Sequence, residues 1–297
     1  MAAWRSANYL GNKQVREFIC MVSTISNSPL ARFSADDVTA LVAGLEQSCG
    51  GTIHFAACDL QTGDALRYHA DDLCKTASVI KLPILVHVAL CVQEGSLHWE
   101  EKLTLTEAEK VEGSGVLTQL TAGLEMSLRD VCTLMTIVSD NTGTNMIIEH
   151  VGTEAVNARM RAMGLPITTC FRKAYSPDTE TSKVYGLGVT TPDEMLDLLT
   201  RLAHDQIGDA ETSRTLRDIL AGQFYRDGIP RLLPEEWKYS GKTGAVNAVR
   251  NDVGIITTPD GRQYALALFC QNLPHVQWTA DNPGLLALAR LTRHILV

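Results

Sequence analysis

The sequence lacks any apolar run long enough to cross a membrane, and it has few aromatic residues. Its 297 residues include 26 Lys and Arg against 34 Asp and Glu, which gives a net charge of −8, and 6% are aromatic. A membrane-spanning helix needs about 18 or more consecutive apolar residues, and an acidic surface repels nucleic-acid phosphates and anionic lipids. We therefore expect no nucleic-acid partner and no membrane association.

The cysteines lack the spacing of metal or redox sites. None of the eight forms a C-x-x-C pair or accompanies His residues at zinc-ligand spacing, so we expect no metal and no cofactor. The apolar stretch at residues 18–22 is too short for a secretory signal peptide. Dispersed cysteines without such a signal predict a cytoplasmic location, with a periplasmic or secreted one as the alternative.

Internal repeats and low-complexity linkers are absent as well, so the organisation must come from periodicity. Residues 34–47 have the Ser cap, acidic first turn and apolar spacing of a helix. Strands are expected at 52–58, 65–68, 252–257 and 264–270. Further helices are expected at 79–92, 128–138, 142–151, 153–163, 192–204, 213–220 and 285–296.

This order of elements predicts an α/β (α+β) fold, with an antiparallel sheet flanked by helices and an inserted all-helical lobe. We expect residues 1–33 to be an N-terminal extension and 34–297 to be one domain. Its sheet lobe would span about 34–72 and 222–297, and its helical lobe about 73–221. A cleft between the lobes is the expected place for a site.

Ser78 and Lys81 are the first candidates for chemistry. Pro83 is tolerated only in the first turn of a helix, which places the helix start close to Ser78. Residues three apart share a helix face, so the Lys81 amine, if neutral, can take the proton of the Ser78 hydroxyl. On its own the pair is weak evidence for chemistry, because a helix cap beside a solvated lysine also explains it.

Two further short motifs allow both a structural and a chemical interpretation. Ser139-Asp-Asn141 joins two expected helices, where its residues can simply cap the helices. In the chemical interpretation, the Ser139 hydroxyl belongs to a proton relay and the Asn141 amide binds a substrate carbonyl. Lys242-Thr-Gly244 follows a probable strand and can hold a substrate carboxylate, with the glycine allowing close approach. A phosphate loop is rejected because its first glycine would fall at Glu236.

Together, S-x-x-K, S-D-N and K-T-G in this order are the motif set of class A β-lactamases and penicillin-binding proteins. The sequence closely resembles this superfamily over about residues 34–297. Similar segments lie at 76–83, 124–130, 138–145, 190–195, 242–245 and 251–253. The resemblance implies a monomeric serine hydrolase that acts on a small β-lactam or related cyclic amide, in antibiotic catabolism and resistance.

The resemblance also implies roles for the motif residues. Ser78 would be the nucleophile and Lys81 its base, while Ser139 and Lys242 would pass a proton to the leaving nitrogen and bind the substrate carboxylate. The implied substrate-binding residues are Asn141 for the acylamide, Thr243 and Arg250 for the carboxylate, Gly244 for close approach, and Ala245, whose N–H with that of Ser78 would form the oxyanion hole.

The sequence departs from the class A pattern in the loop before residue 190. The glutamate that activates the deacylating water in class A enzymes corresponds to Tyr175 in an ungapped match, and the nearest carboxylates are Asp178 and Glu180. A phenol has an ordinary pKa near 10 and is a poor base at neutral pH. This segment is thus a possible deacylation region, with acylation expected to be intact and deacylation doubtful.

Two alternatives to a β-lactamase follow from this departure. One is a penicillin-binding or acyl-trapping protein, and the other is a cytoplasmic esterase or acyltransferase on the same scaffold. In many class A enzymes the position of Cys132 is disulfide-bonded, but its implied partner position here is Leu85. The absence of that bridge also favours a role other than periplasmic defence.

Overall fold

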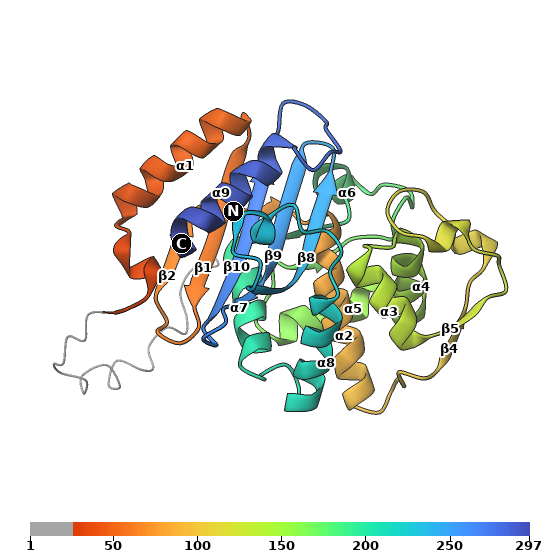
Figure 1. Cartoon of the computed structure of the whole chain (residues 1–297). Coiled ribbons are helices and arrows are strands. Elements are labelled where there is room, and N and C mark those ends of the chain that lie inside the picture. Colours follow the sequence, from red (N-terminus) through yellow and green to blue (C-terminus); the bar gives the residue numbers. More distant parts are fainter. Residues whose placement is uncertain (1–25) are drawn as a thin grey trace, which may run out of the picture.

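The structure, a computed structural model, describes residues 26–297, and its centre is an antiparallel sheet (Figure 1). Within the described residues the strand order of this sheet is β2-β1-β10-β9-β8. Its strands are β1 (Thr52–Asp59), β2 (Ala65–Tyr68), β8 (Lys238–Val246), β9 (Val249–Thr257) and β10 (Gln263–Gln271). The first and last parts of the chain therefore build one sheet, as the sequence predicts.

Helices α1 (Ala35–Cys49) and α9 (Pro283–Leu296) cover one face of this sheet (Figure 1). Ser34 begins α1 with a capping box, in which its hydroxyl accepts from the Asp37 N–H and its own N–H donates to the Asp37 carboxylate. A short 3₁₀ helix, η1 (Pro29–Arg32), precedes α1, and its Leu30 is buried in the same core. Packing into the domain thus begins before residue 34.

The helices of the middle of the chain form a lobe that packs against the other face of the sheet. They are η2 (Ala77–Ile80), α2 (Lys81–Gln93), α3 (Leu128–Ile137), α4 (Asn141–Val151), α5 (Thr153–Ala162), α6 (Glu180–Tyr185), α7 (Pro192–Ala203) and α8 (Ala210–Ala221). One continuous apolar core joins this face of the sheet to α2, α3, α7 and α8. The expected fold class, a sheet with an inserted helical lobe, is confirmed.

The remaining elements are short. Strands β3 (Cys74–Lys75), β7 (Gly188–Thr190) and β6 (Thr169–Cys170) form a small sheet next to η2, and β4 (Lys102–Thr104) pairs with β5 (Glu125–Ser127). The remaining 3₁₀ helices are η3 (Glu107–Glu109), η4 (Leu117–Gln119) and η5 (Ile229–Leu232). None of the described helices is long and apolar enough to cross a bilayer.

Candidate active site

Ser78 lies in η2, half-buried, directly after a residue with strained backbone. Ala77 has φ 46°, in the left-handed region that costs a non-glycine residue energy. Asn251 on β9 holds the preceding segment, because its Nδ2 donates to the carbonyls of Lys75 at 2.8 Å and Thr76 at 3.0 Å. The sheet thereby fixes the turn that presents the Ser78 hydroxyl.

Lys81 is the first residue of α2, one turn after Ser78, and is fully buried. Its Nζ donates to Ser139 O at 2.7 Å, to Ser139 Oγ at 3.2 Å and to Asn141 Oδ1 at 2.9 Å. Burial lowers its pKa well below the ordinary value; the charge of Lys242 lowers it further, and Asp140 opposes this. A neutral amine, which can act as a base, is therefore accessible here.

The Ser139-Asp-Asn141 turn between α3 and α4 combines capping with presentation of the site. Ser139 is buried with φ 54°, which turns its side chain toward Lys81. Asp140 is the helix cap: one carboxylate oxygen accepts from the Gly143 N–H at 2.8 Å, and the other accepts from Val116 N at 2.6 Å and Leu117 N. Within this motif, Asp140 therefore serves as the helix cap, while Ser139 and Asn141 contact Lys81.

Strand β8 lies against η2 at Gly244. A Cβ placed on Gly244 would lie 2.6 Å from the carbonyl oxygen of Thr76 and 3.1 Å from Val79 N. Only glycine permits this approach, which brings the K-T-G strand beside the nucleophile turn. Thr243 is half-buried, and Ala245 at the end of the motif is exposed.

Lys242 is a second buried amine at the site, and its Nζ donates to Thr243 O at 2.8 Å. Burial lowers its pKa to about 7, while the charge of Asp252 acts in the opposite direction. The pKa of Asp252 is raised to about 7, also by burial. Lys242 therefore changes charge near neutral pH.

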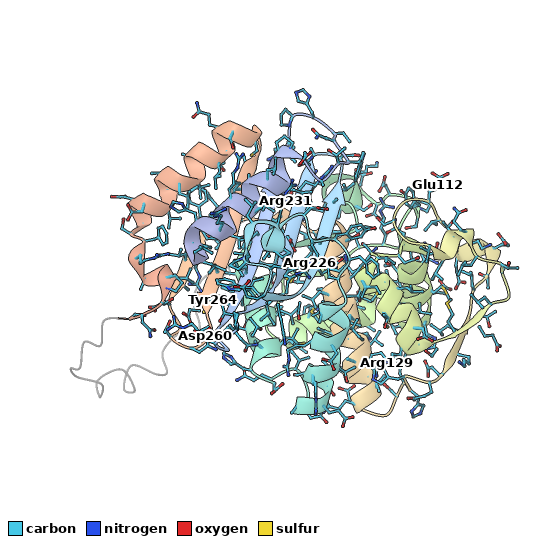
Figure 2. The ribbon with its side chains drawn as sticks, in the orientation of Figure 1. Glu112, Arg129, Arg226, Arg231, Asp260 and Tyr264 are labelled. Carbon is cyan, nitrogen blue, oxygen red and sulfur yellow. The ribbon has the colours of Figure 1, made fainter. Side chains whose placement is uncertain are left out.

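Tyr239 and Asp252 form a buried pair that the sequence motifs did not reveal. The Tyr239 hydroxyl donates to one Asp252 oxygen, and Ile229 N donates to the other at 2.7 Å. The guanidinium of Arg226, labelled in Figure 2, lies 5.6 Å from the centre of the Tyr239 ring. Tyr239 stands two residues before Gly241, and its ring packs on that glycine. This Tyr-x-Gly spacing was the only sign of the buried tyrosine that the sequence offered.

The structure brings Tyr175 to the edge of the site. A Cβ placed on Gly113 would lie 2.9 Å from Tyr175 Oη and 2.7 Å from Asn141 Nδ2, so the phenol and this amide meet at one glycine. Tyr175 is 64% exposed and has φ 59°. The residue before it is anchored, because Asn145 accepts from the Ala174 N–H at 2.7 Å and donates to its carbonyl at 3.1 Å.

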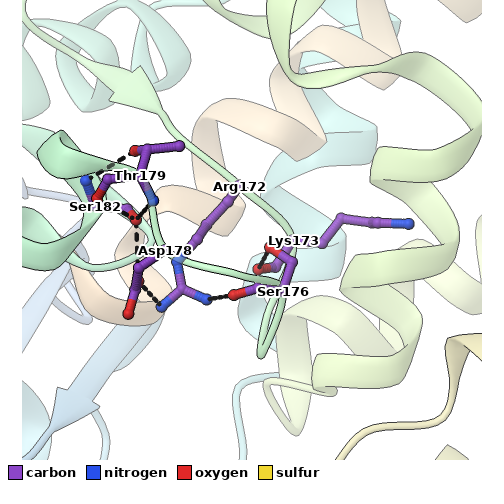
Figure 3. A network of polar contacts seen from close by, with 6 residues as sticks. All are labelled: Arg172, Lys173, Ser176, Asp178, Thr179 and Ser182. Carbon is purple, nitrogen blue, oxygen red and sulfur yellow. Dashed lines mark hydrogen bonds and ion pairs between the residues drawn. The ribbon is translucent and has the colours of Figure 1, made fainter.

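The two carboxylates nearest to Tyr175 in the sequence have other partners, and Figure 3 shows those of Asp178. Asp178 forms an ion pair with Arg172 at 3.0 Å and accepts from Ser182 Oγ at 3.0 Å. Glu180 is 92% exposed and pairs with Lys183 at 2.6 Å. Both carboxylates are thus ion-paired in this structure.

Arg250 is held by backbone carbonyl groups in this structure. It is 2% exposed, and its guanidinium donates to the carbonyls of Asn247 at 3.0 Å, Val249 at 2.6 Å and Gln277. The ring of Trp278 covers it, with 4.6 Å between the guanidinium carbon and the ring centre. Through these hydrogen bonds the guanidinium links the β8–β9 turn to the loop after β10.

The fold and this arrangement of Ser, Lys, Ser and Lys are those of a serine hydrolase. Comparison with known proteins gives the family. Residues 34–296 match the model of the β-lactamase enzyme family, and the chain therefore belongs to that family.

Several relatives agree with this assignment. The β-lactamase of Streptomyces albus G is 27% identical over 245 residues, covering 77% of this chain and 75% of that one. The crystal structure of a β-lactamase from Sphaerobacter thermophilus superposes with a TM-score of 0.80 at 31% identity, covering 89% and 97% of the two chains. A PBP-A variant with one leucine replaced by glutamate, in an acyl-enzyme complex with penicillin G, has a TM-score of 0.76 at 25% identity, covering 87% and 96%.

Proposed function

We propose that the protein hydrolyses a β-lactam or a related cyclic amide through a Ser78 acyl-enzyme, with deacylation as the slow step. The observation that carries this proposal is the buried Lys81 amine, which lies one turn after Ser78 and is hydrogen-bonded to Ser139 and Asn141. A lysine held in this way, with a lowered pKa, is a base for a neighbouring hydroxyl.

Acylation uses the residues of the three motifs. Ser78 Oγ attacks the lactam carbonyl, its proton passes to Lys81 Nζ, and the N–H groups of Ser78 and Ala245 stabilise the oxyanion. As the C–N bond breaks, a proton reaches the leaving nitrogen through Ser139, whose Oγ is 3.2 Å from Lys81 Nζ. The product of this step is an ester on Ser78.

Substrate binding would use the neighbouring polar groups. Lys242, when protonated, and Thr243 hold the substrate carboxylate, while the Asn141 amide binds the acylamide side chain. Asn141 Nδ2 also donates to Glu112 O at 3.2 Å, so a substrate would exchange or share this bond. Gly244 allows the substrate backbone to lie directly against β8.

Deacylation lacks an evident carboxylate base. Tyr175 stands where the glutamate is expected, and Asp178 and Glu180 are engaged with Arg172 and Lys183. General acid–base catalysis typically contributes about 10²–10⁴-fold to a rate, so its absence would prolong the life of the ester. This same observation favours a second candidate function, a penicillin-binding protein that retains its acyl group.

Stopped-flow absorbance with a chromogenic cephalosporin tests both candidates. We expect a burst of one equivalent per protein followed by slower steady turnover, with both phases abolished in Ser78→Ala. A burst without turnover, together with a lasting mass adduct after penicillin treatment, would identify the acyl-trapping protein instead. Absence of both a burst and an adduct would refute acylation by β-lactams.

A further inference from the structure

Three arginines gather at one surface hollow of the sheet lobe, where η1 packs against α9 (Figure 1). The hollow has a volume of about 720 Å³, which is enough for a small molecule. The residues that line it are Arg32, Phe33, Arg290, Arg293, His294 and Val297. All three arginines are exposed. A solute at this place would therefore meet a concentration of positive charge on a chain whose net charge is −8.

The arginines of this hollow differ from most other arginines of the described part of the chain, because none has a carboxylate partner there. Arg159 and Arg201, for comparison, pair with carboxylates at 2.6 Å and 2.5 Å. The guanidinium groups of Arg290 and Arg293 have no hydrogen-bond or ion-pair partner among residues 26–297, and Arg32 donates from Nε alone, to Pro29 O at 3.0 Å. Most of their donors are thus free for a ligand.

The chain itself offers little negative charge to this hollow. Among the described residues that line it, the carboxylate of Val297 is the only negative group. Residues 1–25 contain a single carboxylate, that of Glu17, so they could neutralise at most one arginine. A surplus of positive charge therefore remains at the hollow.

The helix dipole explains only part of this cluster. Basic side chains are favourable in the last turn of a helix, and Arg293 and His294 lie in the last turn of α9. Arg290 lies one turn earlier on the same face, and Arg32 comes from a different element, η1. Their convergence on the same hollow needs another explanation.

We propose that this hollow binds the phosphate groups of a small polyphosphate, either inorganic or carried by a nucleoside. Guanidinium groups donate in a planar fork that fits carboxylate and phosphate oxygens. One fork satisfies a planar carboxylate, whereas a tetrahedral phosphate offers oxygens to guanidinium groups that approach from different elements, as Arg32 and the two arginines of α9 do. Several phosphates in a row also match the charge of three arginines.

A bound polyphosphate would link η1 to α9 and offset the mutual repulsion of the arginines. A ligand that binds only the folded protein stabilises it by mass action, and a concentration ten times Kd should raise the melting temperature by about 3 °C. Because the arginines are exposed, the affinity should fall as NaCl rises from about 0.05 M to about 0.5 M. None of them belongs to the three motifs, so the rate of Ser78 acylation should not change.

Isothermal titration calorimetry of the full chain tests the proposal with four solutes: tripolyphosphate, ATP without divalent metal, adenosine and citrate. We expect one equivalent of tripolyphosphate or ATP to bind, adenosine not to bind, and citrate to bind at least about tenfold more weakly than tripolyphosphate. Equal affinities for the two polyphosphates would locate recognition in the phosphates alone, whereas tighter binding of ATP would show that the nucleoside also contacts the hollow. The proposal is overturned if neither polyphosphate binds at about 1 mM, or if citrate binds as tightly as tripolyphosphate.

Two double variants show whether the polyphosphate binds at this hollow. Arg290→Gln with Arg293→Gln should weaken the binding of both polyphosphates by about tenfold or more, because charge-assisted hydrogen bonds are lost. The matched control is Arg129→Gln with Arg214→Gln, which removes the same charge from exposed arginines of α3 and α8 that also have no ion pair among the described residues (Arg129 is labelled in Figure 2). This control should bind as the native chain does. Equal weakening in both double variants would overturn the proposal, because the attraction would then come from the overall charge.

Discussion

Replacing Tyr175 by glutamate should accelerate deacylation while leaving acylation unchanged. The side chain is 64% exposed, and its hydroxyl lies beside Gly113 and the Asn141 amide. A glutamate is shorter than a tyrosine, so its carboxylate would withdraw from Gly113 and leave space for a water between itself and the Ser78 ester. The positive φ of this position disfavours tyrosine and glutamate alike, so the exchange adds no backbone strain. A substitution at so exposed a site should change the free energy of unfolding by about 0.5 kcal/mol or less.

The expected size of the effect follows from the exposure of this site. General bases contribute about 10²–10⁴-fold, and a carboxylate that stays solvated should act near the lower limit. We therefore expect the acyl-enzyme to disappear about 10²-fold faster, which corresponds to about 2.7 kcal/mol of activation free energy.

Intact mass spectrometry after a penicillin pulse measures this lifetime directly, and the burst rate reports acylation in the same samples. Tyr175→Gln is the matched control, because it has the shape of glutamate without its basicity, and it should leave the lifetime near the native value. An unchanged lifetime in Tyr175→Glu would refute the assignment of this position to the deacylating water. Equal acceleration in both variants would show that removal of the phenol, rather than a new base, is responsible.

Three further predictions concern acylation and the loop. Because the pKa of Lys242 is lowered to about 7, the amine is cationic below this pH and neutral above it, so KM for a carboxylate-bearing substrate should rise as pH increases through 7, whereas KM for an uncharged ester should not. Gly244→Ala should slow the burst and destabilise the protein by about 1–3 kcal/mol in urea titrations, because its Cβ would lie 2.6 Å from Thr76 O; native stability would contradict this reasoning. Arg172→Ala removes the ion pair to Asp178 and the bond to the Ser176 carbonyl, so limited proteolysis should cut this loop faster while the burst rate stays within about twofold, and an unchanged cleavage rate would argue against the network in Figure 3.

Much of the fold follows from local signals in the sequence. Ser34 and its acidic turn predicted α1, and the structure has the expected cap. The hairpin of β1 and β2 begins and ends within one residue of the expected strands. Pro83 limited the start of the helix after Ser78, and the structure has η2 leading into α2 at this place. These features depend on contacts between residues close in sequence, which periodicity and capping rules describe.

Other features depend on distant contacts and were missed. Strands β3, β6 and β7 have two or three residues each, too few to show a period. The Tyr239–Asp252 pair joins two strands whose register was unknown from the sequence. The contacts of Arg250 were also unknown from the sequence, because its guanidinium donates to Gln277 O in the loop after β10 as well as to Asn247 O and Val249 O. In each case the deciding partner lies on another segment of the fold.

The placement of the two half-reactions explains how a chain can retain one while changing the other. The residues expected to acylate Ser78 are buried and bonded several times, since Lys81 has three bonds to the turn at Ser139 and Gly244 contacts η2 closely. Substitutions there would disturb packing as well as chemistry. Tyr175, in contrast, is an exposed residue on a loop, so exchanging it costs the fold little. Deacylation is therefore the step that a single substitution can tune without loss of the scaffold.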